Sequence, residues 1–162
     1  MRPGLYDMKE QLSASLKTGL DTIVVGNVNK SDRPRLLAIL KEYSTHPQYS
    51  GLELTDINTV SLFGDFPINI AAILGRVDDI ETLLNFGADI NSKGEHGYTP
   101  LHYAVEQGHL NVVKFLLENG ANKDITNDDG DTALVLSLLL EEEIMALLNN
   151  WKKESGYIIN EK

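Results

Sequence analysis

The sequence predicts an all-α fold, a solenoid in which short helix-turn-helix units stack side by side. Glycine recurs at positions 64, 97 and 130, which is a fixed period of 33 residues. Segments 64–96 and 97–129 also share the residues that a turn and two helices need, at these aligned pairs: Pro67/Pro100, Ala71/Ala104, Gly75/Gly108, Leu83-Leu84/Leu116-Leu117 and Gly87-Ala88/Gly120-Ala121. A repeat of this length indicates units that each bury an apolar face against a neighbour.

The middle unit, residues 97–129, shows how each element is predicted. Thr99 is a favourable N-cap, and Pro100 suits the first helical turn, where its missing N–H would have no partner. We expect a first helix from Pro100 to Gln107, a reversal at Gly108, and a second helix from His109 to Asn119 whose leucines and valines share one face. Each unit therefore consists of an extended turn and two antiparallel helices.

The middle unit resembles an ankyrin repeat at many positions in register. The matching segments are Thr99-Pro100-Leu101-His102-Tyr103-Ala104, Gly108-His109, Val112-Val113-Lys114-Phe115-Leu116-Leu117 and Gly120-Ala121. The resemblance implies helix pairs that stack side by side, with β-hairpin-like turns projecting at right angles to them. It also implies that His102 ties neighbouring turns together by hydrogen bonds, which argues against a catalytic role for this residue.

The flanking units depart from this pattern. In the unit 64–96, Phe66-Pro67-Ile68-Asn69 stands where Thr-Pro-Leu-His is usual, so the threonine cap and the histidine are both missing. The unit 130–151 keeps the threonine and loses the proline, the histidine and the mid-repeat glycine. Its second helix, Glu141 to Asn150, aligns only after deletion of one residue. We expect this unit to be a C-terminal capping repeat, followed by a tail at 152–162.

Upstream of the clear repeats, residues 20–63 are interpreted as a degenerate N-terminal repeat. It includes an outer helix from Pro34 to Tyr43 and a polar insertion from Ser44 to Gly51, which is either a binding loop or slack. Apolar residues at spacings of three and four predict an amphipathic capping helix at 5–19, with its apolar face formed by Leu5, Met8, Leu12 and Leu16. The whole chain, 1–162, is expected to form one domain.

Composition and charge narrow the function classes. The chain has no cysteine, no apolar run long enough for a membrane span and no signal-peptide pattern at its start, so we expect a cytoplasmic protein that does not bind membranes. Its net charge of −10, from 14 basic and 24 acidic residues, disfavours nucleic-acid binding. The charge has two interpretations, a preference for a basic partner or solubility alone.

The sequence does not predict an enzyme. Its four histidines lack metal-ligand spacing, and no carboxylate pair stands out for acid–base chemistry. Residues 124–136 fail as a calcium loop, because placing Gly130 sixth would make Ile125 the first ligand and Leu136 the last. We therefore expect no catalysis, no cofactor and no metal.

In ankyrin proteins the turn tips and the inner helices form a concave face that usually contacts a protein partner. Alignment with the family carries this role over to apolar, aromatic and acidic positions of three units. These predicted contact residues are Leu62, Phe63, Asp65, Ile73, Leu74, Glu95, His96, Tyr98, Glu106, Gln107, Asp128, Asp129, Asp131, Leu139 and Leu140. Such a mixture suits an interface in which aromatic and apolar anchors supply affinity and charges steer a basic partner.

Each part of this surface also has a purely structural interpretation. The pair Leu62-Phe63 would then fold back onto the degenerate repeat, and Leu139-Leu140 would be packed by Trp151 or Tyr157. The acidic run at 128–131 would then be turn chemistry, since Asp and Gly are preferred in turns.

The sequence thus favours a non-enzymatic module that binds a protein. Its most specific form is an immunity or inhibitor protein that neutralises a toxin or enzyme in a 1:1 heterodimer and is a monomer when free. This form rests on similarity in size and style to compact bacterial ankyrin-repeat proteins, some of which are immunity proteins. The alternatives are a general scaffold, adaptor or regulatory subunit, and a homo-oligomeric assembly protein.

Overall fold

The structure, a computed structural model, describes residues 32–138 and 142–151. The predicted helix at 5–19 and the tail at 152–162 lie outside the described residues, as does the first part of the degenerate repeat. The described helices, in chain order, are α2 (Arg33–Tyr43), the 3-10 turn η2 (Pro47–Tyr49), α3 (Pro67–Ile73), α4 (Val77–Asn85), the 3-10 turn η3 (Glu95–Gly97), α5 (Pro100–Glu106), α6 (Leu110–Glu118), α7 (Ala133–Ser137) and α8 (Glu142–Asn150).

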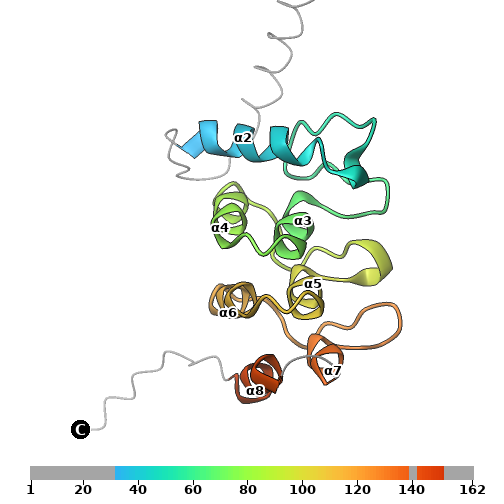
Figure 1. Cartoon of the computed structure of the whole chain (residues 1–162), viewed down its shortest axis with the longest axis vertical. Coiled ribbons are helices and arrows are strands. Elements are labelled where there is room, and N and C mark those ends of the chain that lie inside the picture. The colour runs from blue at the N-terminus through green and yellow to red at the C-terminus, as the bar shows by residue number, and fades with distance from the viewer. Residues whose placement is uncertain (1–31, 139–141, 152–162) are drawn as a thin grey trace, which may run out of the picture.

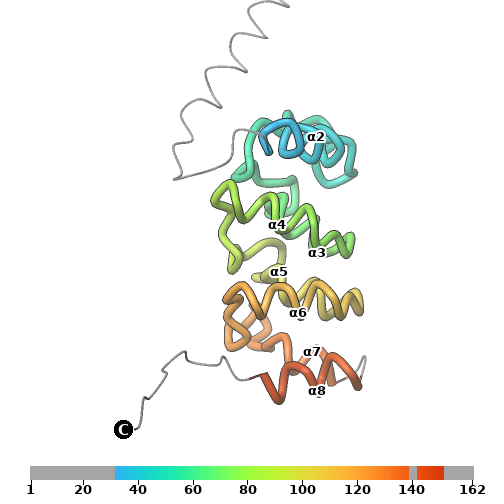
Figure 2. The backbone as a smooth tube through the Cα atoms, turned by 90° about the vertical axis from the view of Figure 1, so that its left-hand side faces the viewer, coloured from blue at the N-terminus to red at the C-terminus, as the bar shows by residue number. Residues whose placement is uncertain are grey.

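Helix pairs stack along one axis of the molecule. Figure 1 shows α3, α5 and α7 in one column beside the projecting turns, and α4, α6 and α8 in a second column. The helix α2 lies across the end of the stack above α3 and α4, and Figure 2 shows the same order after a quarter turn. The predicted all-α solenoid with projecting turns is confirmed. We call α3, α5 and α7 the inner helices because they lie next to the turns.

Two inner helices begin with the same hydrogen bond, although their sequences differ. At α5 the backbone N–H of Thr99 donates to Nδ1 of His102 at 3.2 Å. At α3 the backbone N–H of Phe66 donates to Oδ1 of Asn69 at 3.0 Å. Asn69 therefore caps its helix as His102 does, and the unit 64–96 lacks the motif histidine without losing its structural role.

The same two side chains also connect each unit to the next turn. Nε2 of His102 lies 3.2 Å from the backbone oxygen of Asp131, and Nδ2 of Asn69 donates to the backbone oxygen of Ser92 at 3.3 Å. Both side chains are buried, and burial lowers the pKa of His102. The expectation that His102 ties neighbouring turns together is confirmed.

A close approach explains the glycine in the middle of the unit 64–96. Gly75 has φ +71°, and a Cβ placed there would lie 2.9 Å from the ring of His109 in the next unit. The His109 ring also reaches back, with Nε2 3.0 Å from the backbone oxygen of Ile73. The glycine thus allows the left-handed turn and leaves space for the His109 contact between adjacent units.

The insertion at 44–51 belongs to the core of the N-terminal unit. Tyr49, within η2, is completely buried, and its hydroxyl donates to the backbone oxygens of Asp65 at 3.0 Å and Thr59 at 3.2 Å. Burial raises the pKa of Tyr49. The backbone N–H of Leu62 also donates to the oxygen of Gln48 at 3.0 Å. The insertion therefore supports the first projecting turn and is not slack.

A polar network fixes α2 on α4. The carboxylate of Asp79 is almost fully buried and accepts the Tyr43 hydroxyl proton at 2.9 Å, while Arg35 and Arg76 approach it at 3.4 and 3.6 Å. Arg76 also pairs with Glu42 at 2.5 Å. Burial and the nearby Asp79 raise the pKa of Tyr43. The predicted outer helix at 34–43 is confirmed as α2, and this network holds it at the end of the stack.

Candidate protein-binding surface

The projecting turns share one backbone geometry. We define the first tip as residues 61–65, the second tip as 94–98 and the third tip as 127–131. In each tip the backbone N–H of the first residue donates to the backbone oxygen of the fifth. The pairs are Ser61 with Asp65 at 2.8 Å, Gly94 with Tyr98 at 2.8 Å, and Asn127 with Asp131 at 2.9 Å. The same hydrogen bond, of nearly constant length, therefore recurs in the structure with the 33-residue period of the sequence.

Hydrogen bonds also join each tip to the next. Oδ1 of Asp65 accepts the backbone N–H of Glu95 at 3.0 Å and the hydroxyl of Tyr103 at 2.6 Å. The backbone N–H of Asp128 donates to the backbone oxygen of His96 at 3.0 Å. These bonds hold the tips in a row and order the surface that the tips form.

A family model of ankyrin repeats, in three copies, matches residues 35–127, which is more than half of the chain. The chain belongs to the ankyrin-repeat family. No curated protein matches the chain by sequence comparison. Ankyrin repeats are protein–protein interaction modules.

Among the described residues of the predicted surface, the first tip carries the most exposed apolar side chains. Leu62 is 58% exposed and Phe63 is 54% exposed. Their backbone is fixed, because Ser61 Oγ accepts the N–H of Phe63 at 3.3 Å and Gln48 accepts that of Leu62. The side chains therefore do not fold back onto the degenerate repeat, and they stand in solvent on an ordered turn.

The structure corrects the prediction that Asp65 is an exposed contact residue of the first tip. It is 0% exposed, and its Oδ1 atom holds the second tip through Glu95 and Tyr103. Burial and the hydrogen bond to Asp65 together raise the pKa of Tyr103. Alignment with the family placed Asp65 on the projecting turn and therefore among the contact residues. Here the carboxylate turns inward to two donors, so it organises the surface without contacting a partner.

The second tip combines an exposed residue with a packed one. The centroid of the Tyr98 ring lies 5.5 Å from that of His102 and 5.2 Å from that of Tyr103. Tyr98 is partly buried and packs against the core, and this burial raises its pKa. His96 is exposed and has φ +55°, a left-handed conformation that costs about 1 kcal/mol outside glycine. Glu95 is partly exposed beside it. Of these residues, His96 is the most accessible.

The third tip is acidic and its turn does not depend on its carboxylates. Oδ1 of Asn127 accepts the backbone N–H groups of Asp129 at 3.0 Å and Asp131 at 2.8 Å, which shapes the turn. The side chains of Asp128 and Asp129 are exposed, and that of Asp131 is partly exposed. Within the described part of the chain, no hydrogen bond or ion pair engages the Asp128 or Asp129 carboxylates. The hydrogen-bonding needs of the turn therefore explain the presence of Asn127 better than they explain the presence of the acidic residues.

The ends of the inner helices supply the remaining predicted positions. Leu74 is exposed at the end of α3, while Ile73 is partly buried against the core. Glu106 and Gln107 are exposed at the end of α5. The pair Leu139-Leu140 lies outside the described residues. Sequence alignment missed Leu138, which follows α7 and is among the most exposed large apolar residues, because no aligned unit has an exposed leucine there.

The accessible positions change chemistry along the stack while the backbone stays the same. The first tip offers Leu and Phe, the second Glu and His, and the third two aspartates. The corresponding residues are Leu62/Glu95/Asp128 and Phe63/His96/Asp129. The surface thus runs from apolar to acidic over three tips.

His102, for which the resemblance argued against a catalytic role, is engaged in structural contacts. Both ring nitrogens of His102 take part in hydrogen bonds, with Thr99 and Asp131, and the side chain is buried. Among residues 32–138 and 142–151, no group of three or more potential ligands could hold a metal ion. No helix in these same ranges is long and apolar enough to cross a bilayer.

Proposed function

We propose that this ankyrin-repeat protein is a non-enzymatic module that binds one protein partner through its three tips and the ends of its inner helices. The observation that carries the proposal is the pair Leu62-Phe63, two large apolar side chains more than half exposed on a hydrogen-bonded turn. A soluble protein gains nothing in stability from apolar side chains held in water. An aromatic anchor on a rigid turn is, in contrast, typical of residues that dominate binding energy.

Charge supports a partner with a basic region. The net charge of the chain is −10, and the exposed Asp128 and Asp129 concentrate negative charge at one end of the row of tips. Charges at the edge of an interface chiefly increase the association rate and orient the partner. The apolar first tip would then supply affinity, and the acidic third tip would supply steering.

We further propose that the partner is a toxin-like effector, which the protein neutralises by covering a functional surface. The similarity to compact bacterial ankyrin-repeat proteins, some of which are immunity proteins, motivates this choice. The hydrogen bonds between tips support it, because an inhibitor benefits from a surface that loses little conformational entropy on binding. A scaffold or regulatory subunit would use the same surface without abolishing the partner's activity.

The decisive experiment is a 1:1 complex with an assay of the partner. The full chain is expected to co-purify with one effector and to suppress its activity, and Phe63→Asp is expected to lose both effects. Ala146→Asp, an exposed substitution on the outer helix α8, is the matched control and should retain both. Binding with full residual effector activity would contradict neutralisation and favour an adaptor.

The homo-oligomer alternative has its own test. If exposed apolar residues such as Phe63 formed contacts between copies, light scattering of the purified chain would show a dimer or larger species that Phe63→Asp dissociates. We expect a monomer for both proteins. A stable oligomer that depends on Phe63 would replace the heterodimer proposal.

A further inference from the structure

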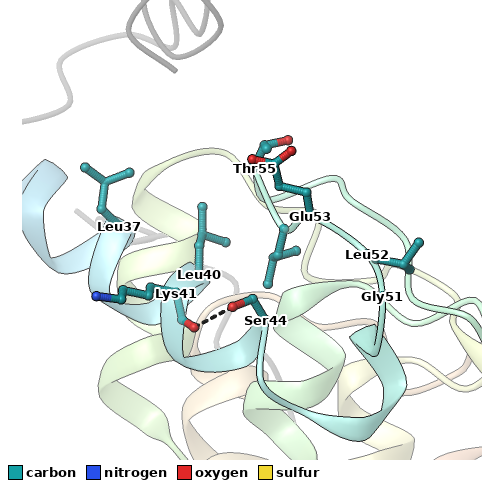
Figure 3. Close-up of a pocket in the computed structure, with 9 residues that line it drawn as sticks. Leu37, Leu40, Lys41, Ser44, Gly51, Leu52, Glu53 and Thr55 are labelled. Carbon is teal, nitrogen blue, oxygen red and sulfur yellow. Dashed lines mark hydrogen bonds between the residues drawn. The ribbon is translucent and has the colours of Figure 1, made fainter. Parts of the chain in front are cut away.

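A second apolar surface lies at the opposite side of the N-terminal unit from α3. It is a groove of about 540 Å³ between α2 and the loop that follows η2. Figure 3 shows Leu37 and Leu40 on α2 facing the loop that carries Leu52 and Glu53. The full lining is Leu37, Leu40, Lys41, Ser44, Gly51, Leu52, Glu53, Leu54 and Thr55. Leucines thus form most of its apolar wall.

The position of the groove in the stack explains why it is open. The helix α2 packs on α3 and α4 from one side only, and Figure 1 places no described helix beyond it. Leu37 is 42% exposed and Leu52 is 36% exposed, while Leu40 and Leu54 are buried beneath them. In a repeat protein the terminal unit normally receives a cap that covers such a face.

We propose that residues 5–18 of the same chain form an amphipathic helix that lies in this groove and caps the stack. The segment carries Leu5, Met8, Leu12 and Leu16 at helical spacing, which gives it one apolar face. Its four large apolar side chains match a groove whose wall and floor are leucines. The groove is therefore an internal docking site for the N-terminal segment and is separate from the tips.

The chain is long enough to place the segment there. Residue 32 immediately precedes α2, so residues 19–31 form the connection between the segment and the groove. A connection of this length spans about 40 Å when extended, at roughly 3.3 Å per residue. An 11-residue helix such as α2 is only about 16 Å long, so residues 5–18 can lie along it in either direction.

The connection favours the chain's own segment as the occupant. Residues 5–18 hold two basic and two acidic residues, a net charge of zero, so the fit to the groove rests on the apolar face and on the length of the connection. The short connection also raises its local concentration above that of a second copy at ordinary protein concentrations.

Hydrogen exchange of the full chain tests the proposal directly. We expect the amides of residues 9–18 to exchange at least about tenfold more slowly than in an unstructured chain, because docking stabilises the helix. Leu37→Asp, which places a charge in the groove, should remove this protection. Ala38→Asp, an exposed neighbour on α2 that does not line the groove, should preserve it. Unprotected amides at 9–18 in the unaltered chain would overturn the proposal.

Further measurements on the same samples separate docking from general effects. Amides of α5 report the folding of the stack, and they should exchange equally in all variants. If Leu37→Asp perturbs α5, Leu12→Asp provides the same test from the segment, and retention of protection at 9–18 in that variant would overturn the proposal. The chain has no cysteine, so Leu12→Cys paired with Leu37→Cys can also be cross-linked cleanly, with Ala14→Cys as the control on the opposite helix face. Cross-linked dimers in place of monomers would assign the groove to a second copy.

Discussion

The first and third tips have the same backbone and opposite chemistry. Each is closed by a hydrogen bond between its first and fifth residues, at 2.8 Å from Ser61 to Asp65 and 2.9 Å from Asn127 to Asp131. The first tip exposes Leu62 and Phe63, whereas the third exposes two aspartates. Since the turn does not need either pair for its shape, the difference between them is available for recognition.

The fifth residue of the tip shows a second difference. It is aspartate in both, but Asp65 is buried between tips and Asp131 is partly exposed. Tyr103 and the backbone of Glu95 hold the Asp65 carboxylate, and the structure gives Asp131 no equivalent pair of side-chain bonds. One residue type therefore joins two units at one end of the stack and faces solvent at the other.

Replacing the two aspartates should give the largest difference in stability. Asp65→Ala leaves the buried Tyr103 hydroxyl and the Glu95 N–H without their acceptor, and we expect it to lower the free energy of unfolding by about 3 kcal/mol. Asp131→Ala, the control at the equivalent tip position, should cost less than about 0.5 kcal/mol. Urea denaturation followed by circular dichroism measures both. Equal costs would show that the Asp65 contacts do not hold the tips together.

The exposed pair at the first tip should dominate binding. Phe63→Ala is expected to weaken affinity for the partner by about 2 kcal/mol with little change in stability, because the side chain is mostly in solvent in the free protein. Asp129→Ala, at the same tip position, should reduce affinity much less. Calorimetric titration of the partner compares the two variants. A smaller effect for Phe63 than for Asp129 would move the anchor of the interface to the acidic end.

The sequence predicted the repeat and the helix pairs well because these depend on local residue types. Glycine at turns and proline at helix starts restrict the backbone directly, and leucines at helical spacing identify the buried faces. Residues 100–106 and 110–118 formed helices within one or two residues of the expected bounds. The period of 33 residues then predicted the equivalent tips, since one geometry repeats along the chain.

The candidate binding surface was harder to predict because the exposure of a side chain depends on its neighbours in the next unit. Asp65 was expected in solvent, yet donors from the second tip hold it inside. Tyr98 was expected as a free anchor, but two aromatic rings of its own unit pack against it. Asn69 was treated as a lost histidine, although it makes equivalent hydrogen bonds. The signal that could have identified this last substitution was that Asn69, like His102, carries both a hydrogen-bond acceptor and a donor at the cap position.

The acidic end of the surface should act on the rate of association. Replacing Asp128, Asp129 and Asp131 by Asn removes three negative charges and keeps the backbone bonds to Asn127. We expect association to slow by roughly tenfold at low salt and its salt dependence to weaken, with dissociation nearly unchanged. Stopped-flow mixing with the partner at several salt concentrations provides the measurement. An unchanged association rate would leave the acidic run without a role in recognition.

The second tip is neither as apolar as the first tip nor as acidic as the third. Replacing its His96 tests the stability of the tip and its role in recognition at one residue. His96 holds φ +55° while its backbone oxygen accepts the N–H of Asp128, so its conformation is required to join two tips. Glycine adopts this conformation without steric cost, and His96→Gly should therefore stabilise the protein by about 0.5 kcal/mol after its greater freedom in the unfolded chain is included. Thermal unfolding would show a small increase in Tm, and partner affinity would fall if the exposed imidazole contacts the partner. A decrease in Tm would mean that the imidazole stabilises the tip in the free protein. The left-handed conformation of His96 would then have a structural cause instead of a functional one.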